Sequence, residues 1–234
     1  MQELIQYPNR RKGVFRMNIR EFLESVLHLT DENTVHQLSA VAKVEHLKKS
    51  SILAEAGEIQ AQLPVLIKGI LRGFVIDADG RDVTDCFVHR CGDIAVGCNL
   101  LGTPSQISME AMTDCDLISI PMAPVLDLLE TSPDLMRLYN GYLFEALNRH
   151  WEEKMLMHQC SAMQRYLWFL REYPGLIDLI SNKHIASFLG MTPVTLSRLR
   201  RQLGETRRSR AESDGPDEHP RGAAPVGAGC GQSK

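Results

Sequence analysis

The chain has 234 residues, of which 44% are hydrophobic and 24% charged, so it can bury the core of one large or two small domains. The longest uncharged stretch, residues 94–109, contains glycine, proline and polar side chains and does not supply the roughly 20 apolar residues of a membrane span. The first 20 residues lack the apolar segment of a secretory signal. We therefore expect a globular, cytoplasmic protein with no membrane partner.

Charge is distributed unevenly along the chain. The formal net charge is −3, but residues 17–160 hold 11 Lys/Arg and 21 Asp/Glu, whereas residues 161–210 hold 9 and 3. A near-neutral total does not exclude a polyanionic partner, because the field that attracts phosphate is local. The C-terminal part is the candidate for such a contact.

The N-terminal part is predicted to begin with a peripheral extension, residues 1–16, followed by short helices over residues 17–42. Ile19, Phe22 and Leu23 fall on one helical face, at spacings of three and four residues. Thr30 is the predicted N-cap of the second helix, because acidic residues follow it where a helix N-terminus favours them.

Between residues 44 and 121, short β-like runs are separated by glycines. The predicted strands are residues 63–69, 70–77, 81–89, 107–112 and 116–121. Asp79-Gly80 lies between the second and third runs and predicts a hairpin, because glycine accepts a positive φ. Evenly spaced short strands predict a barrel or roll rather than alternating strand–helix units.

A long helix is predicted from Pro133 to about Gln159. Its apolar stripe consists of Leu135, Leu138, Tyr139, Tyr142, Leu143, Ala146, Leu147, Trp151, Met155 and Leu156. Such a helix spans roughly 40 Å, more than a small domain covers from one side. We predict a dimerisation helix over residues 133–160; an ordinary core helix is the alternative.

Residues 181–203, SNKHIASFLGMTPVTLSRLRRQL, predict two helices joined by a tight turn at Gly190. Ser181 and Thr192 are the predicted N-caps, and Pro193 takes the first position of the second helix. Leu196, Leu199 and Leu203 are predicted to form its buried seam. Residues 161–204 therefore form a candidate helix-turn-helix domain. Residues 205–234, rich in glycine, proline and charge, are predicted to be disordered.

The outward side of the second helix has the size and chemistry that fit a major groove, and double-stranded DNA is the predicted partner. The candidate contacts are Lys183, Thr192, Val194, Thr195, Ser197, Arg198 and Arg201. Arg198 can donate two hydrogen bonds to guanine, and Val194 can contact a thymine methyl. Hydroxyls and Lys183 suit phosphates, which position the protein without reading sequence. A solvated basic helix in a small bundle is the alternative.

The order of a glycine-marked roll, a long helix and a helix-turn-helix resembles the Crp/Fnr family of bacterial transcription regulators over residues 17–203. The roll's landmarks are AEAGE at Gly57, LIKGILRGF at Gly69 and HRCGD at Gly92. The resemblance implies an α+β fold whose N-terminal domain, residues 17–132, is a double-stranded β-helix or jelly roll of the cyclic-nucleotide-binding type. It also implies a homodimer on a two-fold symmetric operator, with RNA polymerase as a further partner.

The resemblance also implies a pocket for a small-molecule effector in the roll, which maps to Val96, Gly97, Cys98, Asn99, Gln106 and Ser108. The cyclic-AMP-dependent members hold the ribose with a glutamate and the cyclic phosphate with an arginine. This chain has no glutamate directly after Gly97 and no basic residue from Cys91 to Met136. Burying a phosphate without a cation is costly, so we expect an effector other than a cyclic nucleotide, or none.

The candidate reading helix also departs from the family. Pro193-Val194 stands where the cyclic-AMP-dependent members carry Arg-Glu, while Arg198 matches the family's second base-reading arginine. We therefore expect a different operator sequence. The segment after Leu203 lacks a strand pattern, so the wing hairpin of many relatives is expected to be missing.

The six cysteines lack the C-x-x-C pairs of zinc sites, and none precedes Cys86, so the iron–sulfur cluster of the oxygen-sensing branch is not expected. Cys86, Cys91, Cys98 and Cys115, with His89, could form a redox or metal sensor, but buried structural thiols are the favoured interpretation. We predict no metal, no cofactor and no enzymatic activity, because no set of residues suggests catalysis. The remaining alternative is a ligand-binding or scaffold protein with a vestigial helix-turn-helix.

Overall fold

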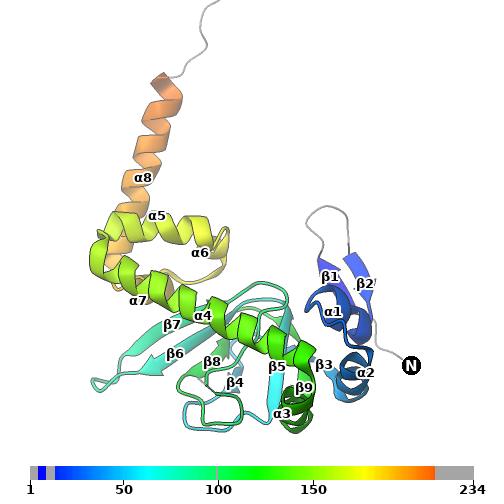
Figure 1. Cartoon of the computed structure of the whole chain (residues 1–234). Coiled ribbons are helices and arrows are strands. Elements are labelled where there is room, and N and C mark those ends of the chain that lie inside the picture. Colours follow the sequence, from blue (N-terminus) through cyan, green and yellow to red (C-terminus); the bar gives the residue numbers. More distant parts are fainter. Residues whose placement is uncertain (1–4, 9–13, 99, 214–234) are drawn as a thin grey trace, which may run out of the picture.

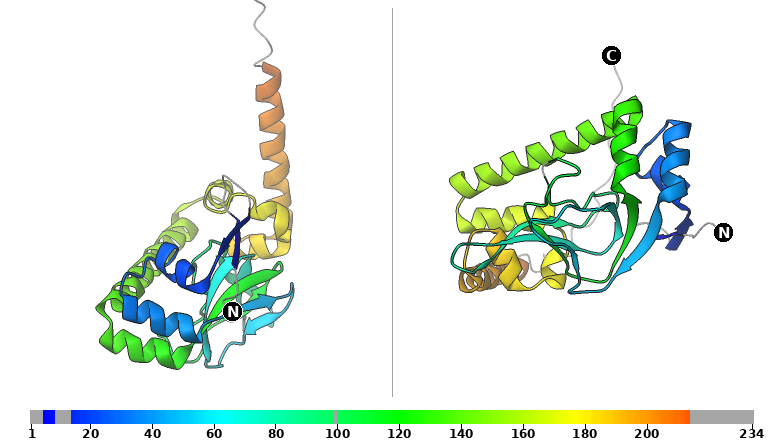
Figure 2. Two further views of the ribbon diagram at one scale, coloured as in Figure 1. Left: turned by 90° about the vertical axis from the view of Figure 1, so that its right-hand side faces the viewer. Right: turned by 90° about the horizontal axis from the view of Figure 1, so that it is seen from below.

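The computed structural model describes residues 5–8, 14–98 and 100–213, with the side chains of residues 18–98 and 100–204. A β-roll, a long helix and a group of C-terminal helices follow one another along the chain (Figure 1). The long helix crosses the face of the roll, and the C-terminal helices lie at its far end (Figures 1 and 2). This is the mixed α+β architecture that the sequence predicted.

The N-terminal elements are a hairpin and two short helices: β1 (Ile5–Pro8), β2 (Val14–Met17), α1 (Ile19–Ser25) and α2 (Glu32–Val41). The prediction of Thr30 as the N-cap of α2 was wrong, because Asp31 caps this helix. The Thr30 N–H and hydroxyl donate instead to the carboxylate of Asp134 in the long helix, the N–H at 2.6 Å. The Asp31 N–H donates to the same carboxylate at 2.9 Å, so this carboxylate ties the N-terminal helices to the long one.

Two antiparallel sheets form the roll. The three-stranded sheet has the order β3 (Lys43–Leu47), β9 (Cys115–Pro121), β5 (Gln62–Lys68), and the four-stranded sheet has the order β4 (Ile52–Ala54), β8 (Ser108–Ala111), β6 (Leu71–Ile76), β7 (Asp82–Val88). The ends of all five predicted strands lie within one residue of those observed. The predicted hairpin is also confirmed, with Gly80 at φ 77° between β6 and β7.

The strand β5 separates two apolar cores, because its side chains alternate between the faces of the sheet. Leu63, Val65 and Ile67 face the core shared with the helices, whereas Leu66 belongs to the core of the roll itself. A strand buried on both faces is expected to be continuously apolar, as β5 is.

The helix α3 (Met122–Thr131) is followed directly by the long helix α4 (Pro133–Gln159), whose predicted ends are confirmed. The Ser132 hydroxyl caps α4 by accepting the Leu135 N–H at 3.3 Å, and Pro133 occupies the first turn, where its missing N–H costs nothing. Among the helices that the structure describes, none combines the length and apolar character needed to cross a bilayer.

The C-terminal helices, here called the head, are α5 (Ala162–Glu172), α6 (Leu176–Leu179), α7 (Asn182–Phe188) and α8 (Pro193–Ser213). The prediction that order ends after Gly204 was wrong for residues 205–213, which continue α8. No proline follows Pro193 until Pro216, and the intervening residues tolerate a helix. The rest of the predicted tail lies outside the described residues. The expected lack of a wing hairpin after α8 also concerns residues outside the described ones.

Candidate DNA-reading surface and effector cavity

The helices α7 and α8 form the predicted helix-turn-helix. Gly190 adopts φ 59° in the turn between them. The Thr192 hydroxyl accepts the Thr195 N–H at 3.1 Å, as predicted for the N-cap of α8. Leu196 is fully buried in the head, and Leu199 and Leu203 pack against the same core. The leucine seam therefore fixes which side of α8 faces away from the protein.

Most of the predicted DNA contacts lie on that outward side. Val194 is 61% exposed, and Thr192, Ser197, Arg198 and Arg201 are also exposed. We call Val194, Ser197, Arg198 and Arg201 the reading face.

The other two predicted contacts are placed differently. Thr195 is half-buried, and its hydroxyl lies 2.9 Å from that of Thr192, so it belongs to the cap. Lys183 lies on α7, with its ammonium 4.0 Å from the carboxylate of Asp82 in the roll. This ion pair is largely exposed and can yield to a phosphate.

Two further arginines hold the turn in position, and neither role was visible in the sequence. The Arg200 guanidinium donates to the Asn182 side chain at 2.8 Å and joins α8 to the start of α7. The Arg165 guanidinium donates to the backbone carbonyls of Met157 and Gly190, each at 3.4 Å. Through these two contacts Arg165, which lies on α5, bridges the end of α4 and the turn before α8.

The head is docked on the roll through the edge strand β7. The Phe87 ring lies 5.2 Å from that of Phe188 and belongs to the apolar core of the head. Beside it, the Thr84 N–H donates to the Ser187 hydroxyl at 3.0 Å. The apolar contact and this hydrogen bond together restrain the head against the roll.

A buried arginine supports this docking strand. Arg72 is 1% exposed, and its guanidinium donates to the carboxylates of Asp82 and Glu110 at 2.6 and 2.9 Å. The hydrogen bonds from Arg72 hold the pKa of Asp82 below its ordinary value. The same carboxylate faces Lys183, so one charge cluster joins the roll to α7.

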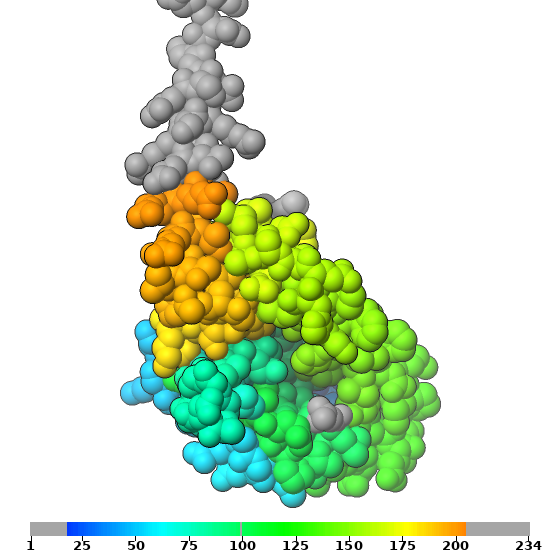
Figure 3. Space-filling view, turned by 90° about the vertical axis from the view of Figure 1, so that its left-hand side faces the viewer, coloured from blue at the N-terminus to red at the C-terminus, as the bar shows by residue number. Residues whose placement is uncertain are grey.

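A cavity of about 830 Å³, here called the larger cavity, lies between the roll and α4. Figure 3 shows a hollow between the roll, in teal, and α4, in green. Of the predicted effector residues, Val96, Gly97, Cys98 and Gln106 line this cavity. Ser108 does not, because its hydroxyl accepts the Ala56 N–H elsewhere in the roll. Asn99 lies outside the described residues.

The larger cavity contains a half-buried cation that the sequence did not reveal. Arg149 of α4 lines it, 13 residues after the end of the segment in which no basic residue was found. Burial alone would lower the pKa of Arg149, but the charges of Asp93, Glu145 and Glu153 outweigh this effect and raise that pKa. Its guanidinium also pairs with Glu145 at 3.3 Å. The cation is therefore already neutralised by acids, and an anionic ligand would have to displace them.

Three of the predicted sensor cysteines, Cys86, Cys91 and Cys98, line the larger cavity. Burial raises the pKa of Cys86 to about 12 and also raises the pKa values of Cys98 and Cys115. Thiols with raised pKa values are poor nucleophiles and poor metal ligands at neutral pH, because the thiolate is the reactive form. Within the described part of the chain, no three or more His, Cys, Asp or Glu side chains are grouped for a metal ion.

The outer side of α4 carries an uncovered apolar stripe. Phe144, Leu147 and Trp151 are 69%, 61% and 62% exposed, at spacings of three and four residues. The predicted stripe is therefore divided: Leu135 and Leu156 are buried, whereas Leu147 and Trp151 are exposed, together with Phe144, which the prediction did not include. We call Phe144, Leu147 and Trp151 the outer row.

Residues 44–132 match the cyclic nucleotide-binding domain family. Among solved structures, FixK2 from Bradyrhizobium japonicum is 23% identical, with a TM-score of 0.62 over 71% of this chain and 86% of that chain. A regulator from Eubacterium rectale assigned to the Crp/Fnr family is 19% identical, with a TM-score of 0.60 over 78% of this chain and 87% of that chain. The c-di-GMP-responsive global regulator CLP from Xanthomonas campestris is 16% identical, with a TM-score of 0.57 over 82% of this chain and 96% of that chain. No curated protein sequence matches the chain.

Proposed function

We propose that this chain, which has the fold of the Crp/Fnr regulators, is a cytoplasmic transcription regulator that binds duplex DNA as a homodimer. The observation that carries the proposal is the exposed reading face of α8, held outward by the fully buried Leu196 and fixed by the Thr192 cap. The family likeness supports the DNA-binding class of function. RNA polymerase is the further partner if the bound protein activates transcription.

The reading face offers groups of two kinds to a major groove. Arg198 can donate a bidentate pair to the O6 and N7 atoms of guanine, and the exposed Val194 can contact a thymine methyl. Thr192, Ser197 and Arg201 are suited to phosphates beside the groove. Lys183 can join them by exchanging Asp82 for a phosphate oxygen, since the distance of 4.0 Å marks a weak pair.

Replacing Arg198 with alanine is expected to weaken specific binding by about 1–3 kcal/mol, that is, roughly five- to 150-fold, and to relax the preference at one base pair. The measurement is a binding titration with operator fragments selected from the source genome. Arg171→Ala is the matched control, since Arg171 is an exposed arginine of α5 outside the reading face. Equal losses in the two variants would contradict a reading role for Arg198.

The outer row of α4 is the proposed dimer contact. Replacing Leu147 with glutamate should convert a dimer into a monomer at micromolar concentration, because it places a charge in an apolar interface. Sedimentation equilibrium measures the change. Leu179→Glu is the control, because Leu179 is similarly exposed, at 60%, but lies on α6. A wild-type chain that is already monomeric would contradict the dimer.

Cyclic AMP and cyclic GMP are expected to bind weakly or not at all. The roll segment from Cys91 to Met136 supplies no cation, and Arg149 is engaged by acids. Isothermal titration of the full chain should show no heat of binding at micromolar concentrations of either nucleotide. A micromolar dissociation constant would contradict this account of the cavity.

A further inference from the structure

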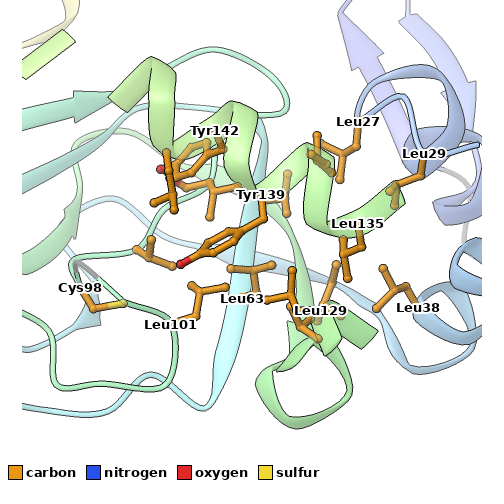
Figure 4. Close-up of a pocket in the computed structure, with 17 residues that line it drawn as sticks. Leu27, Leu29, Leu38, Leu63, Cys98, Leu101, Leu129, Leu135, Tyr139 and Tyr142 are labelled. Carbon is orange, nitrogen blue, oxygen red and sulfur yellow. The ribbon is translucent and has the colours of Figure 1, made fainter. Parts of the chain in front are cut away.

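A second, smaller cavity lies beneath the first half of α4, on the helix-facing side of the three-stranded sheet (Figure 4). This chamber has a volume of about 50 Å³. Leu63 of β5, Leu129 of α3 and Leu135 of α4 are among its walls, which are apolar apart from two tyrosines and one cysteine. An enclosed space of this kind binds apolar groups rather than water.

One polar group faces this apolar space without a partner. The Tyr139 ring lines the chamber, and its hydroxyl points toward the side where Cys98 and Leu101 lie (Figure 4). No described residue forms a hydrogen bond with that hydroxyl, whereas the hydroxyl of Tyr142, one turn further on, donates to the Ile94 carbonyl at 3.0 Å. Half-buried tyrosine hydroxyls usually have a partner, so the one on Tyr139 is available to a ligand.

The chamber adjoins the larger cavity. The two share Leu27, Ile94, Val96, Cys98, Leu138 and Tyr142 as lining residues. The charged groups of the larger cavity are largely engaged with one another: Arg149 pairs with Glu145 at 3.3 Å and Arg137 with Asp134 at 3.1 Å. An uncharged polar group can occupy such a space without separating these pairs, whereas a carboxylate or phosphate would meet an excess of acids.

We propose that the effector is an uncharged amphipathic molecule whose alkyl end fills the chamber and whose polar head lies where the two cavities meet near Cys98, on the side to which the Tyr139 hydroxyl points. The chamber is too small for a whole ligand and takes only the terminal carbons of a chain. A regulatory role for this effector rests on the proposed function. The helix α4 carries the chamber on one side and the outer row, the proposed dimer contact, on the other. An occupant would therefore set the position of α4, and Arg165 would pass that position to the turn before α8.

The test uses the full chain and the fluorescent probe N-phenyl-1-naphthylamine, displaced by 1-hexanol, 1-octanol and 1-decanol. Each added pair of methylenes should tighten binding about 15-fold until the chamber is filled, since one buried methylene is worth roughly a factor of four. Octanoate and octylamine serve as charged counterparts of 1-octanol, and tighter binding of octylamine than of 1-octanol would overturn the claim that the effector is uncharged. We expect octanoate to bind at least tenfold more weakly. Failure of the alcohols to displace the probe, or equal binding of octanoate, would overturn the proposal.

Two variants locate the binding. Val125→Leu adds a methylene inside the chamber and should weaken octanol binding at least tenfold, whereas Val83→Leu, at a position of β7 that lines neither cavity, should not. Tyr139→Phe keeps the ring, loses the hydroxyl and should weaken octanol several-fold. Unchanged octanol binding in both chamber variants overturns the proposal, and Tyr139→Phe decides alone if Val125→Leu unfolds.

Alcohol binding is measured without DNA, so the two hypotheses fail separately. A chain that binds octanol in the chamber but no DNA contradicts the proposed function alone. A chain that binds DNA but no alcohol contradicts this inference alone.

Discussion

Replacing Phe87 with alanine is expected to lower the free energy of unfolding by about 3–5 kcal/mol. The side chain is 1% exposed, and its ring contacts those of Phe188, Phe169 and Tyr173 at centroid distances of 5.2, 6.3 and 6.0 Å. The loss combines the transfer free energy of the ring with the cavity left between β7 and the head. Denaturant unfolding followed by circular dichroism measures it.

The same substitution should also loosen the head selectively. Hydrogen exchange in α7 should accelerate, because Ser187 and Phe188 of that helix contact β7. Phe22→Ala is the matched control: Phe22 is fully buried in the core beneath α1 and α2, so its loss should cost similar stability without a specific effect on α7. Equal acceleration in the two variants would show that Phe87 is not the link between roll and head.

Replacing Glu153 with glutamine is expected to remove much of the pH dependence of stability between pH 5 and pH 8. Burial, with Asp85 and Glu152 nearby and Arg149 acting against them, raises the pKa of Glu153 from an ordinary 4.5 to about 7. Because the pKa of Glu153 is higher in the folded state than in the unfolded state, its contribution to stability is fully present below pH 4.5 and is lost as the pH rises through 7. As the pH rises from 5 to 8, the free energy of unfolding of the glutamine variant relative to that of wild type should therefore increase by about 2 kcal/mol.

The measurement is a series of denaturant titrations at pH 5, 6, 7 and 8. Glu152→Gln is the matched control, because Glu152 is the exposed neighbour on the same helix and, as the weakest of the causes that shift the pKa of Glu153, should change the wild-type profile only slightly. If the free energies of unfolding of wild type and Glu153→Gln change with pH in parallel, the Glu153 carboxyl does not titrate between pH 5 and pH 8. The Glu153 carboxylate accepts a hydrogen bond from Tyr173 at 3.5 Å, so its charge affects the contact between α4 and the head.

Local patterns were sufficient for the strands β5 to β9 and for the cap of the reading helix, but they missed β3 and β4. Alternating or continuous apolar residues predicted five strands of the roll, because a strand's faces are set by residues two apart. Thr192 and Pro193 predicted the start of α8, because the chemistry of a helix N-terminus depends only on its own first turn. The reading face followed from the leucine seam, which fixes the opposite side of one helix.

Contacts between distant segments were not predictable in the same way. Arg149 reaches the cavity only because α4 crosses the roll, and no spacing in the sequence relates it to Gly97. Phe87 looks like any inward residue of a strand, yet it completes the core of the head. The continuation of α8 beyond Gly204 was missed because the prediction relied on the polar, charged composition of this segment. It overlooked that no helix-breaking proline occurs there before residue 216.

The account is tested most directly by hydroxyl-radical footprinting on genomic fragments that the purified chain retains, combined with a salt titration of their affinity. We predict two protected half-sites whose centres lie about one helical turn apart, and an affinity that falls steeply as salt rises. Retention of no fragment at low ionic strength, or weak binding that is insensitive to salt and leaves no footprint, would contradict the claim that α8 reads DNA.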